Sequence, residues 1–199
     1  MKFRQLLIKR AFDFLLAGLG LVFTSPIIIT AWIVASIETR SNGFFFQSRV
    51  GQNKKLFILV KIKTMRPTLG INANVTQSGD VRITKSGAFF RNTKIDELPQ
   101  LWNVLVGQMS FVGPRPDVEG YADKLLGTDS LILSVRPGIT GPASLKYKNE
   151  EALLMKKANP EQYNNEVIWP DKVKINIQYV SNWSFSKDIG YICQTITGA

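Results

Sequence analysis

The 199-residue chain is predicted to form a membrane-associated α/β fold with an N-terminal membrane helix, a small β-hairpin and several further helices. Three observations lead to this prediction. An uncharged apolar stretch lies near the N-terminus, apolar runs rich in β-branched and aromatic residues follow it, and the C-terminal third has a helical texture. We expect one core, because the length is short for two independent domains.

The apolar stretch contains 24 uncharged residues, from Phe14 to Ile37. At a rise of ~1.5 Å per residue, a helix of this length could cross a bilayer core of roughly 30 Å. Pro26 removes an amide donor and clashes with the carbonyl of Val22, so we expect a kink at Ser25–Pro26, where the Ser25 hydroxyl could satisfy the freed carbonyl. Both flanks are basic and give no orientation. The residues therefore leave a kinked span and a re-entrant hairpin equally open, with a buried helix of a soluble protein as a third alternative.

The net charge of +10 is unevenly distributed. Residues 1–66 hold 11 of the 25 Lys and Arg but only two acids, whereas the rest of the chain is nearly neutral. A basic segment that flanks an apolar one favours attraction to anionic lipid headgroups. Nucleic-acid binding is the competing interpretation, and the absence of a basic stripe on a folded face weighs against it.

The scarce residue types restrict the chemistry. The single cysteine, Cys193, excludes an internal disulfide, so a cytosolic face is allowed. The chain has no histidine, which excludes Ser-His-Asp and Cys-His pairs and every histidine metal site. Catalysis must then depend on carboxylates, Lys, Arg, Tyr or a bound cation.

The segments after the apolar stretch are predicted as follows. Residues 44–52 and 55–65 indicate a β-hairpin that turns at Gly51-Gln52-Asn53, and residues 66–80 indicate an exposed loop near the site. A helix is expected from about Asp96 to Val106, ended by Gly107. Residues 110–117 and 135–142 contain paired prolines and indicate rigid loops.

Helices are expected from about Glu150 onward. The last one sets apolar residues among Lys187, Asp188 and polar side chains. Such a helix is typical of a membrane interface, although packing of the same apolar face on the core is an equal alternative. The apolar residues are Trp183, Phe185, Ile189, Tyr191, Ile192 and Ile196.

Asp96 and Glu97 are adjacent acids at the predicted helix start. Acids at this position are most often there because the helix dipole stabilises them. The same geometry would place amide donors for a phosphate next to an acidic nucleophile. Several cations accompany the pair, and an arginine held between two prolines suits fork-like binding of phosphate oxygens. They are Lys61, Lys63, Arg91, Lys94, Arg115 and Arg136.

This combination of carboxylates, arginines and rigid loops beside a membrane anchor indicates phosphoryl chemistry on a lipid. The residues alone name neither substrate. Each of Lys61, Lys63 and Arg136 is individually more typical of a solvated cation than of a ligand contact.

Several motifs, read in order, resemble the bacterial sugar transferase family, the monotopic phosphoglycosyl transferases. They are KRAFDFLLA, SP, QSRVG, KIKTM, RITKSGAFFRNTKIDELPQLWNVLVGQMSFVGPRP and VRPGITG, between about residues 9 and 141. The resemblance implies a polyprenyl-phosphate sugar-1-phosphate transferase of the small, minimal-domain type. In that reaction an aspartate attacks the sugar-bearing phosphorus of a UDP-sugar, UMP leaves, and polyprenyl (undecaprenyl) phosphate takes the phosphosugar.

The resemblance also implies residue roles. Asp96 would be the nucleophile and a neighbour of Mg²⁺, Glu97 would complete the dyad, and Lys61, Arg91, Arg115 and Arg136 would bind substrate phosphates. The Ser25–Pro26 break matches the family's re-entrant membrane helix, which decides for a helix-break-helix with both ends cytoplasmic. Residues 1–40 would then form the basic flank and membrane helix, and residues 41–199 a catalytic domain on the cytosolic face of the bacterial inner membrane, forming one unit with the anchor.

Some positions depart from the family pattern. Lys94 stands where serine is common, Gln108 replaces an aspartate, Ile62 replaces an aromatic residue, and the segment after Gly141 differs. A glycosyltransferase that releases UDP and a non-catalytic anchor protein are the rival interpretations. The sequence leaves open which sugar and glycan pathway are involved, and whether a homodimer forms.

Overall fold

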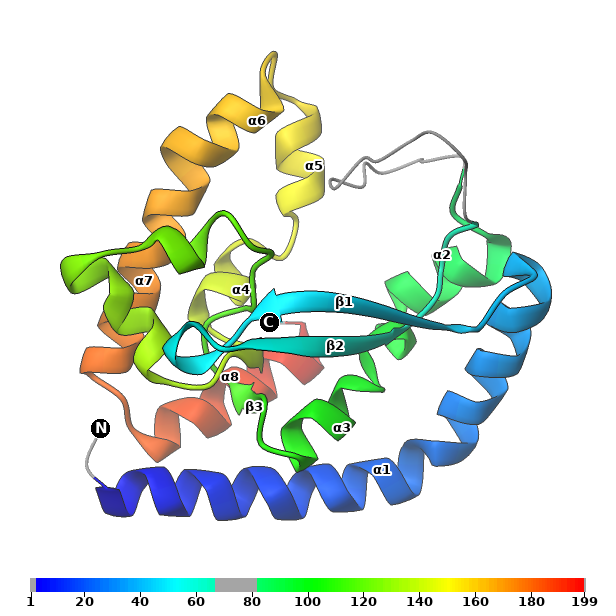
Figure 1. Ribbon diagram of the computed structural model, residues 1–199, viewed down its shortest axis with the longest axis horizontal. Helices are drawn as coiled ribbons and strands as arrows, with labels where there is room; N and C mark the ends of the chain where they lie inside the picture. Colours follow the sequence, from blue (N-terminus) through cyan, green and yellow to red (C-terminus); the bar gives the residue numbers. More distant parts are fainter. Residues whose placement is uncertain (1–2, 67–81, 199) are drawn as a thin grey trace.

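The computed structural model describes residues 3–66 and 82–198, so the loop expected at 66–80 lies, apart from Arg66, outside the described residues. The described part is a helix-rich α/β fold (Figure 1). Its α-helices are α1 (Phe3–Thr39), α2 (Lys85–Asn92), α3 (Gln100–Leu105), α4 (Pro142–Lys146), α5 (Glu150–Met155), α6 (Pro160–Tyr163), α7 (Trp169–Ser181) and α8 (Phe185–Thr197). The strands are β1 (Phe44–Val50), β2 (Leu56–Ile62), β3 (Ser110–Val112) and β4 (Gly138–Thr140). Short 3-10 helices are η1 (Gln52–Lys54), η2 (Ile95–Glu97), η3 (Ala122–Lys124) and η4 (Gly127–Ser134), and η5 (Asn164–Ile168) is π-helical.

Helix α1 is one continuous helix of 37 residues that contains Pro26. Figure 1 shows it running along the base of the molecule and bending upward toward its C-terminal end. The expected break is therefore absent, and a bend replaces it. Ser25 Oγ donates to the carbonyl of Val22 at 2.9 Å, as predicted for the carbonyl that Pro26 leaves without a donor. This bond keeps the helix intact across the proline.

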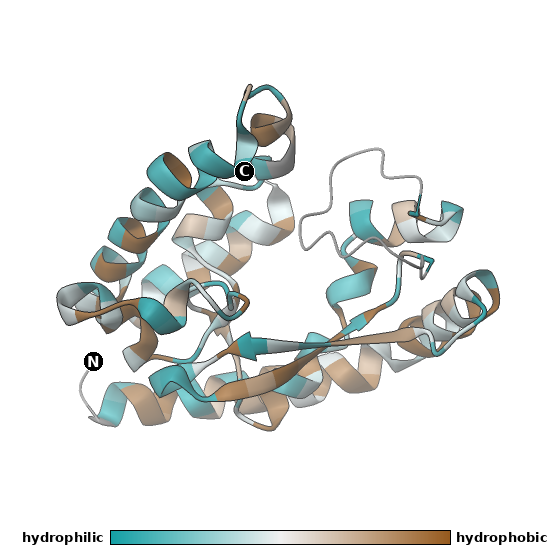
Figure 2. Ribbon diagram, turned by 45° about the horizontal axis from the view of Figure 1, so that its top comes forward, coloured by the Kyte–Doolittle hydropathy of each residue, from teal (hydrophilic) through white to brown (hydrophobic). Residues whose placement is uncertain are grey.

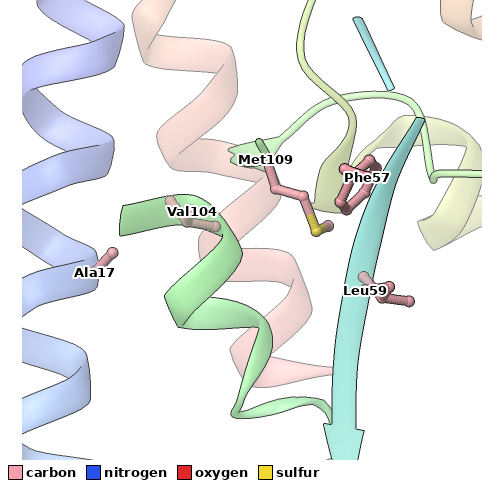
Figure 3. Close-up of a cluster of buried hydrophobic side chains, with 5 residues drawn as sticks. All are labelled: Ala17, Phe57, Leu59, Val104 and Met109. Carbon is pink, nitrogen blue, oxygen red and sulfur yellow. The ribbon is translucent and has the colours of Figure 1, made fainter. Parts of the chain in front are cut away.

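The inner side of α1 packs on the rest of the fold through small residues. Ala17, Ala31 and Ala35 are all at most 2% exposed. Figure 3 shows Ala17 facing a cluster formed by Phe57, Leu59, Val104 and Met109. Ala31 and Ala35 belong to a second cluster, with Ile28, Ile62 and Phe90. Small side chains let the backbone of α1 lie close to the domain along both of its halves.

The outer side of α1 is apolar and uncovered. Leu15, Val22, Phe23 and Ile37 are each more than 60% exposed. Figure 2 shows the hydrophobic colour along this helix and on the neighbouring hairpin. By length and composition, Arg4–Thr39 is long and apolar enough to cross a membrane, and only 11% of its most apolar window is buried. A core helix of a soluble protein would be mostly buried, so membrane association is plausible for this one.

The basic residues that begin α1 are partly used inside the protein. Lys9 is 8% exposed, and its Nζ lies 2.5 Å from Asp188 Oδ2. Arg10 donates to the carbonyls of Val104 and Leu105, both at 2.7 Å. The expectation that the whole basic flank serves lipid headgroups is thus wrong for these two residues. The physical reason is electrostatic: Lys9 meets the buried Asp188 carboxylate, and Arg10 lies at the C-terminal end of α3, where a cation meets the negative end of the helix.

Replacing Arg10 by alanine is expected to lower the free energy of unfolding by about 2 kcal/mol, because two charge-assisted hydrogen bonds to carbonyls are lost. Urea unfolding in detergent micelles measures the change. Arg4→Ala is the matched control, since Arg4 lies exposed on the same helix. Equal stability of the Arg10 and Arg4 variants would contradict this role.

The predicted β-hairpin is confirmed. β1 and β2 pair antiparallel in a register that runs from Phe44 opposite Ile62 to Val50 opposite Leu56. The connection contains η1, in which Asn53 adopts positive φ at 54°. The hairpin directs Lys61, near the end of β2, toward the turn that carries the paired acids.

The helix predicted at 96–106 is only partly confirmed. The α-helical part begins at Gln100, after Pro99, and Asp96 and Glu97 lie on the 3-10 turn η2 that precedes it. Gly107 follows the helix with φ at 84°, a conformation that glycine adopts without strain. The two acids are therefore presented on a tight turn and not on the first turn of an α-helix.

The two proline-rich segments are not simply loops. Each contains a short strand, and β3 pairs parallel with β4, Ser110 opposite Gly138 and Val112 opposite Thr140. A Cβ at Gly138 would lie 2.1 Å from the backbone nitrogen of Gly113, so only glycine permits this approach. Strands of three residues are too short to show a sequence periodicity. The prolines did not prevent strand pairing, because they lie before or after the paired residues and not among them.

The C-terminal third is helical, as predicted. Of the apolar residues of the last segment, Trp183, Tyr191 and Ile192 pack against the buried cluster of Val112, Val135, Tyr179 and Val180. Phe185 meets Phe12 of α1 edge-on, with ring centroids 5.2 Å apart. Core packing therefore accounts for part of this apolar face, whereas Phe185 and Ile196 remain 36% and 80% exposed.

Candidate active site

The turn η2 is fixed by the apolar residues on either side of the acids. Ile95 and Leu98 pack against the cluster that includes Ile28 and Ala31 of α1. Lys94, directly before the turn, adopts φ 59°, a left-handed conformation that is uncommon for a side chain of this kind. Ile95 and Leu98 are partly buried there, and Glu97 reaches Lys61 of β2 and Arg115 of the loop after β3.

Glu97 is held by two cations. Its Oε1 accepts from Lys61 Nζ at 2.8 Å and from Arg115 Nη2 at 2.9 Å. The Glu97 side chain is 14% exposed, and that of Lys61 is 19% exposed. Burial alone would raise the pKa of Glu97, but Arg115 and Lys61 outweigh it and hold the pKa well below its usual range. Glu97 is thus a fixed anion whose charge is already neutralised.

Asp96 has the opposite character. It is 8% exposed, and its Oδ1 is buried without a hydrogen-bond partner among the described residues. Burial and the neighbouring Glu97 carboxylate raise the pKa of Asp96, and Lys61, Lys94 and Arg91 oppose that rise. A carboxylate with a free oxygen and a raised pKa is a better nucleophile than a hydrogen-bonded one.

Arg115 connects the loop after β3 to the paired acids. The preceding Pro114 is fixed, because its carbonyl accepts from Gly138 N at 2.8 Å, and the following Pro116 carbonyl accepts from Arg49 Nη1 at 3.1 Å. The Arg115 side chain is nevertheless 50% exposed. One Nη is used by Glu97, and the rest of the guanidinium is reachable from solution.

The structure brings some predicted site residues together and not others. Lys61, Arg91 and Arg115 surround Asp96 and Glu97, Arg91 through its electrostatic effect on Asp96. Arg136 lies elsewhere, because its Nε donates to the carbonyl of Gly107 at 2.7 Å, beyond the far end of α3. Burial and the neighbouring Arg10 of α1 lower the pKa of Arg136.

Three further residues near the site were not singled out from the sequence. Arg49 supports the Pro116 carbonyl, and Asp117 lies among the site's cations. Asn103 joins α3 to β2, since it donates to the Ile58 carbonyl at 2.7 Å and accepts from Val60 N at 3.2 Å. The sequence could have pointed to two of them: Arg49 lies within the motif QSRVG, and Asp117 directly follows Pro116. Nothing in the sequence pointed to Asn103.

The departure at Gln108 has a structural explanation. Its Oε1 accepts from Asn103 Nδ2 at 2.7 Å. The same nitrogen also bonds the Ile58 carbonyl, so Gln108 completes the contact between α3 and β2.

The donor set permits a divalent cation at Asp96. The unpartnered Oδ1 is an oxygen of the kind that Mg²⁺ prefers. Within the described residues, no group of three or more acidic, histidine or cysteine side chains could hold a metal. A cation at Asp96 would therefore take most of its ligands from water and substrate phosphates, as Mg²⁺ commonly does.

Comparison with known proteins gives a consistent family. The chain is 35% identical to the uncharacterized sugar transferase EpsL of Bacillus subtilis, over 96% of this chain and 86% of that protein. It is 32% identical to the UDP-glucose:undecaprenyl-phosphate glucose-1-phosphate transferase of Escherichia coli, over 96% of this chain and 39% of that protein. It is 34% identical to the UDP-N-acetylgalactosamine-undecaprenyl-phosphate N-acetylgalactosaminephosphotransferase of Aeromonas hydrophila, over 69% of this chain and 34% of that protein.

The chain thus spans most of EpsL and little more than a third of the two longer enzymes. The model of the family described as bacterial sugar transferase matches residues 4–199. This match includes α1, the turn with Asp96 and Glu97, and the loop with Arg115. The chain belongs to the bacterial sugar transferase family.

Proposed function

We propose that the protein transfers a sugar 1-phosphate from a UDP-sugar to polyprenyl (undecaprenyl) phosphate and releases UMP. The observation that carries the proposal is the division between two adjacent carboxylates: Glu97 is neutralised by Lys61 and Arg115, whereas Asp96 keeps an oxygen free. Two of the relatives are named as enzymes that use UDP-sugars and undecaprenyl phosphate, which supports the substrate classes.

In the first step, an oxygen of the Asp96 carboxylate attacks the phosphorus that bears the sugar. A bond forms between Asp96 and phosphorus, the bond from that phosphorus to the bridging oxygen breaks, and UMP leaves with the electron pair. Arg115 supports this step, because its exposed guanidinium face can bind phosphate oxygens while Glu97 fixes its orientation.

In the second step, a phosphate oxygen of the polyprenyl phosphate attacks the same phosphorus. The bond to Asp96 breaks, and the carboxylate returns to its initial state. The bond between the sugar and its phosphate oxygen stays intact throughout. The product is therefore a polyprenyl diphosphate sugar, and the enzyme needs no external base in either step.

Mg²⁺ held by Asp96 and the donor phosphates would supply charge neutralisation, so that an anionic carboxylate can approach a diphosphate. Within the chain, Lys61 and Arg115 contribute fixed positive charge at the same place. Burial lowers the pKa of Lys61, but the Glu97 carboxylate opposes this and favours the charged ammonium.

The structure of α1 supports a re-entrant position in the inner membrane, with the catalytic domain on the cytosolic face. Near the start of the helix, Lys9 and Arg10 bond to α8 and α3, and near its end Glu38 accepts from the Ser86 backbone N–H of α2 at 3.3 Å. Both ends thus contact one domain. If the exposed apolar middle inserts into the bilayer, both ends must lie on the same side.

Pro26 is expected to favour this arrangement. In cells expressing a Cys193→Ser background, Arg4→Cys and the reference Lys174→Cys should both resist a membrane-impermeant thiol reagent until lysis. Pro26→Ala should expose part of the Arg4→Cys population from outside, because a straighter helix favours a span. Labelling of Arg4→Cys in intact cells without the Pro26 change would contradict the re-entrant position.

The released nucleotide tests the proposed reaction. Purified protein in nanodiscs is incubated with a panel of UDP-sugars, Mg²⁺ and undecaprenyl phosphate. The proposal expects UMP, in amounts that depend on the lipid phosphate. Release of UDP would instead identify a glycosyltransferase, and release of neither nucleotide with any donor would favour a non-catalytic anchor protein.

A further inference from the structure

Asp117 lies two residues after Arg115, in the loop that follows β3. Its backbone carbonyl accepts from Val50 N at 2.9 Å, which fixes the loop to the end of β1. Arg115 therefore has Glu97 on one side, at 2.9 Å, and Asp117 as a further electrostatic partner. This places a second carboxylate beside the cation that the proposed reaction uses for phosphate binding.

The cations that face Asp117 have their hydrogen bonds directed elsewhere. Lys172 of α7 pairs with Glu150 of α5 at 2.6 Å. The Nη atoms of Arg49 donate to the Pro116 carbonyl and to Gln47 Oε1, at 3.1 and 2.6 Å. Among the described residues, none donates a hydrogen bond to the Asp117 carboxylate.

The Asp117 carboxylate is an acceptor that the described residues leave unused. The residue is partly exposed, and a small cavity lined by Gly51, Pro114, Arg115 and Leu133 borders it. Burial raises the pKa of Asp117 to about 6, although Lys172, Arg49 and Arg115 pull it downward. Near neutral pH it is therefore mostly an anion that attracts hydrogen-bond donors.

We infer that Asp117 is a donor-binding residue that accepts hydrogen bonds from the hydroxyl groups of a ring of the donor. This inference rests on the proposed function. In a UDP-sugar the diphosphate is flanked by two hydroxyl-bearing rings, the ribose and the sugar. A diphosphate bound at Arg115 places one of these rings within reach of Asp117, where a carboxylate can accept from two neighbouring hydroxyls.

The first half-reaction tests the inference. Enzyme without lipid phosphate is mixed with increasing concentrations of the donor. Because no acceptor is present, each enzyme molecule releases UMP once, and the rate of this release is measured. Asp117→Asn is expected to raise the half-saturating donor concentration roughly tenfold to a hundredfold, because an amide presents one acceptor oxygen and no charge. The maximal rate should stay within a few-fold. Asp129→Asn, an exposed acid on η4, should leave both values unchanged.

Competition by UMP separates the two rings. If Asp117 binds the ribose, Asp117→Asn weakens the binding of UMP, measured by inhibition, as much as it weakens the binding of the donor. If Asp117 binds the sugar, inhibition by UMP is unchanged, and only the binding of the donor becomes weaker. Either result supports the inference and shows whether the hydroxyls that bind Asp117 belong to the ribose or to the sugar.

The pH dependence of the wild-type protein gives a measurement that needs no variant. The groups that face Asp117 are Arg49 of β1, Arg115 of its own loop, Glu150 of α5 and Lys172 of α7. The half-saturating donor concentration should rise as pH falls through about 6, where Asp117 gains a proton, and this rise should vanish in Asp117→Asn.

Two outcomes would overturn the inference. One is an unchanged half-saturating concentration in Asp117→Asn together with no rise at low pH in the wild type. The other is a loss confined to the maximal rate, which would mean that Asp117 only positions Arg115. Failure of the wild-type protein to release UMP would contradict the proposed function instead, so the two failures are distinguishable.

Discussion

Asp96→Asn is expected to abolish phosphosugar transfer, with a loss of at least roughly a thousandfold in turnover. The amide matches the carboxylate in shape but has no anionic oxygen to attack phosphorus. Stability should not fall. Burial raises the pKa of Asp96, so the folded state disfavours its ionised form. That penalty is fully present above the folded-state pKa and absent only below the lower, unfolded-state pKa, and the amide removes it.

The measurement combines turnover, urea unfolding and membrane association of the same variant. Near neutral pH, the expected pattern is no activity, a free energy of unfolding equal to or above that of the wild type, and unchanged sedimentation with membranes. Substantial residual turnover would contradict the nucleophile assignment. A large loss of stability would show that Asp96 has a hydrogen-bonding role that the unpartnered Oδ1 argues against.

Glu97→Gln should give a different pattern from its neighbour. The substitution removes the anion that pairs with Lys61 and Arg115. Because Lys61 is largely buried, its uncompensated charge should lower the free energy of unfolding by roughly 3 kcal/mol, whereas the half-exposed Arg115 contributes little. Turnover should also fall by roughly a hundredfold, since Arg115 is no longer oriented.

Lys61→Met in the Glu97→Gln background provides the control for this argument. If the stability loss comes from an unpaired buried cation, removing the cation should restore much of it. The double variant should regain stability without regaining activity. If the stability loss of the double variant instead equals the sum of the losses in Glu97→Gln and Lys61→Met, the unpaired cation is not the cause.

The hairpin and the kink were predictable from the sequence because their determinants are local. Alternating apolar residues around Gly51 define the hairpin, and the backbone geometry of Pro26 predicts both the bend and the use of Ser25. The residues alone made Arg115 a candidate phosphate ligand and Lys61 a weaker one, and the family resemblance then implied that both bind substrate phosphates. Their contact to Glu97 joins residues separated by 36 and 18 positions, which no local pattern encodes.

The errors in prediction have a common origin in long-range pairing. Lys9 and Arg10 looked like lipid-facing cations, but their partners are Asp188 and the carbonyls that end α3. Arg136 was predicted to bind a substrate phosphate, but its Nε donates to the Gly107 carbonyl, beyond the far end of α3. In each case, a basic residue was judged by its neighbours in sequence, whereas its partner is supplied by a distant segment.

The central claim is that Asp96 forms a covalent bond to the phosphosugar, and mass spectrometry tests it most directly. The wild-type protein is incubated with Mg²⁺ and the donor but without lipid phosphate, quenched and digested. We expect a phosphosugar adduct on the peptide that contains Asp96, absent in Asp96→Asn and lost on addition of undecaprenyl phosphate. Stoichiometric transfer to the lipid without any adduct, or an adduct that persists in Asp96→Asn, would contradict it.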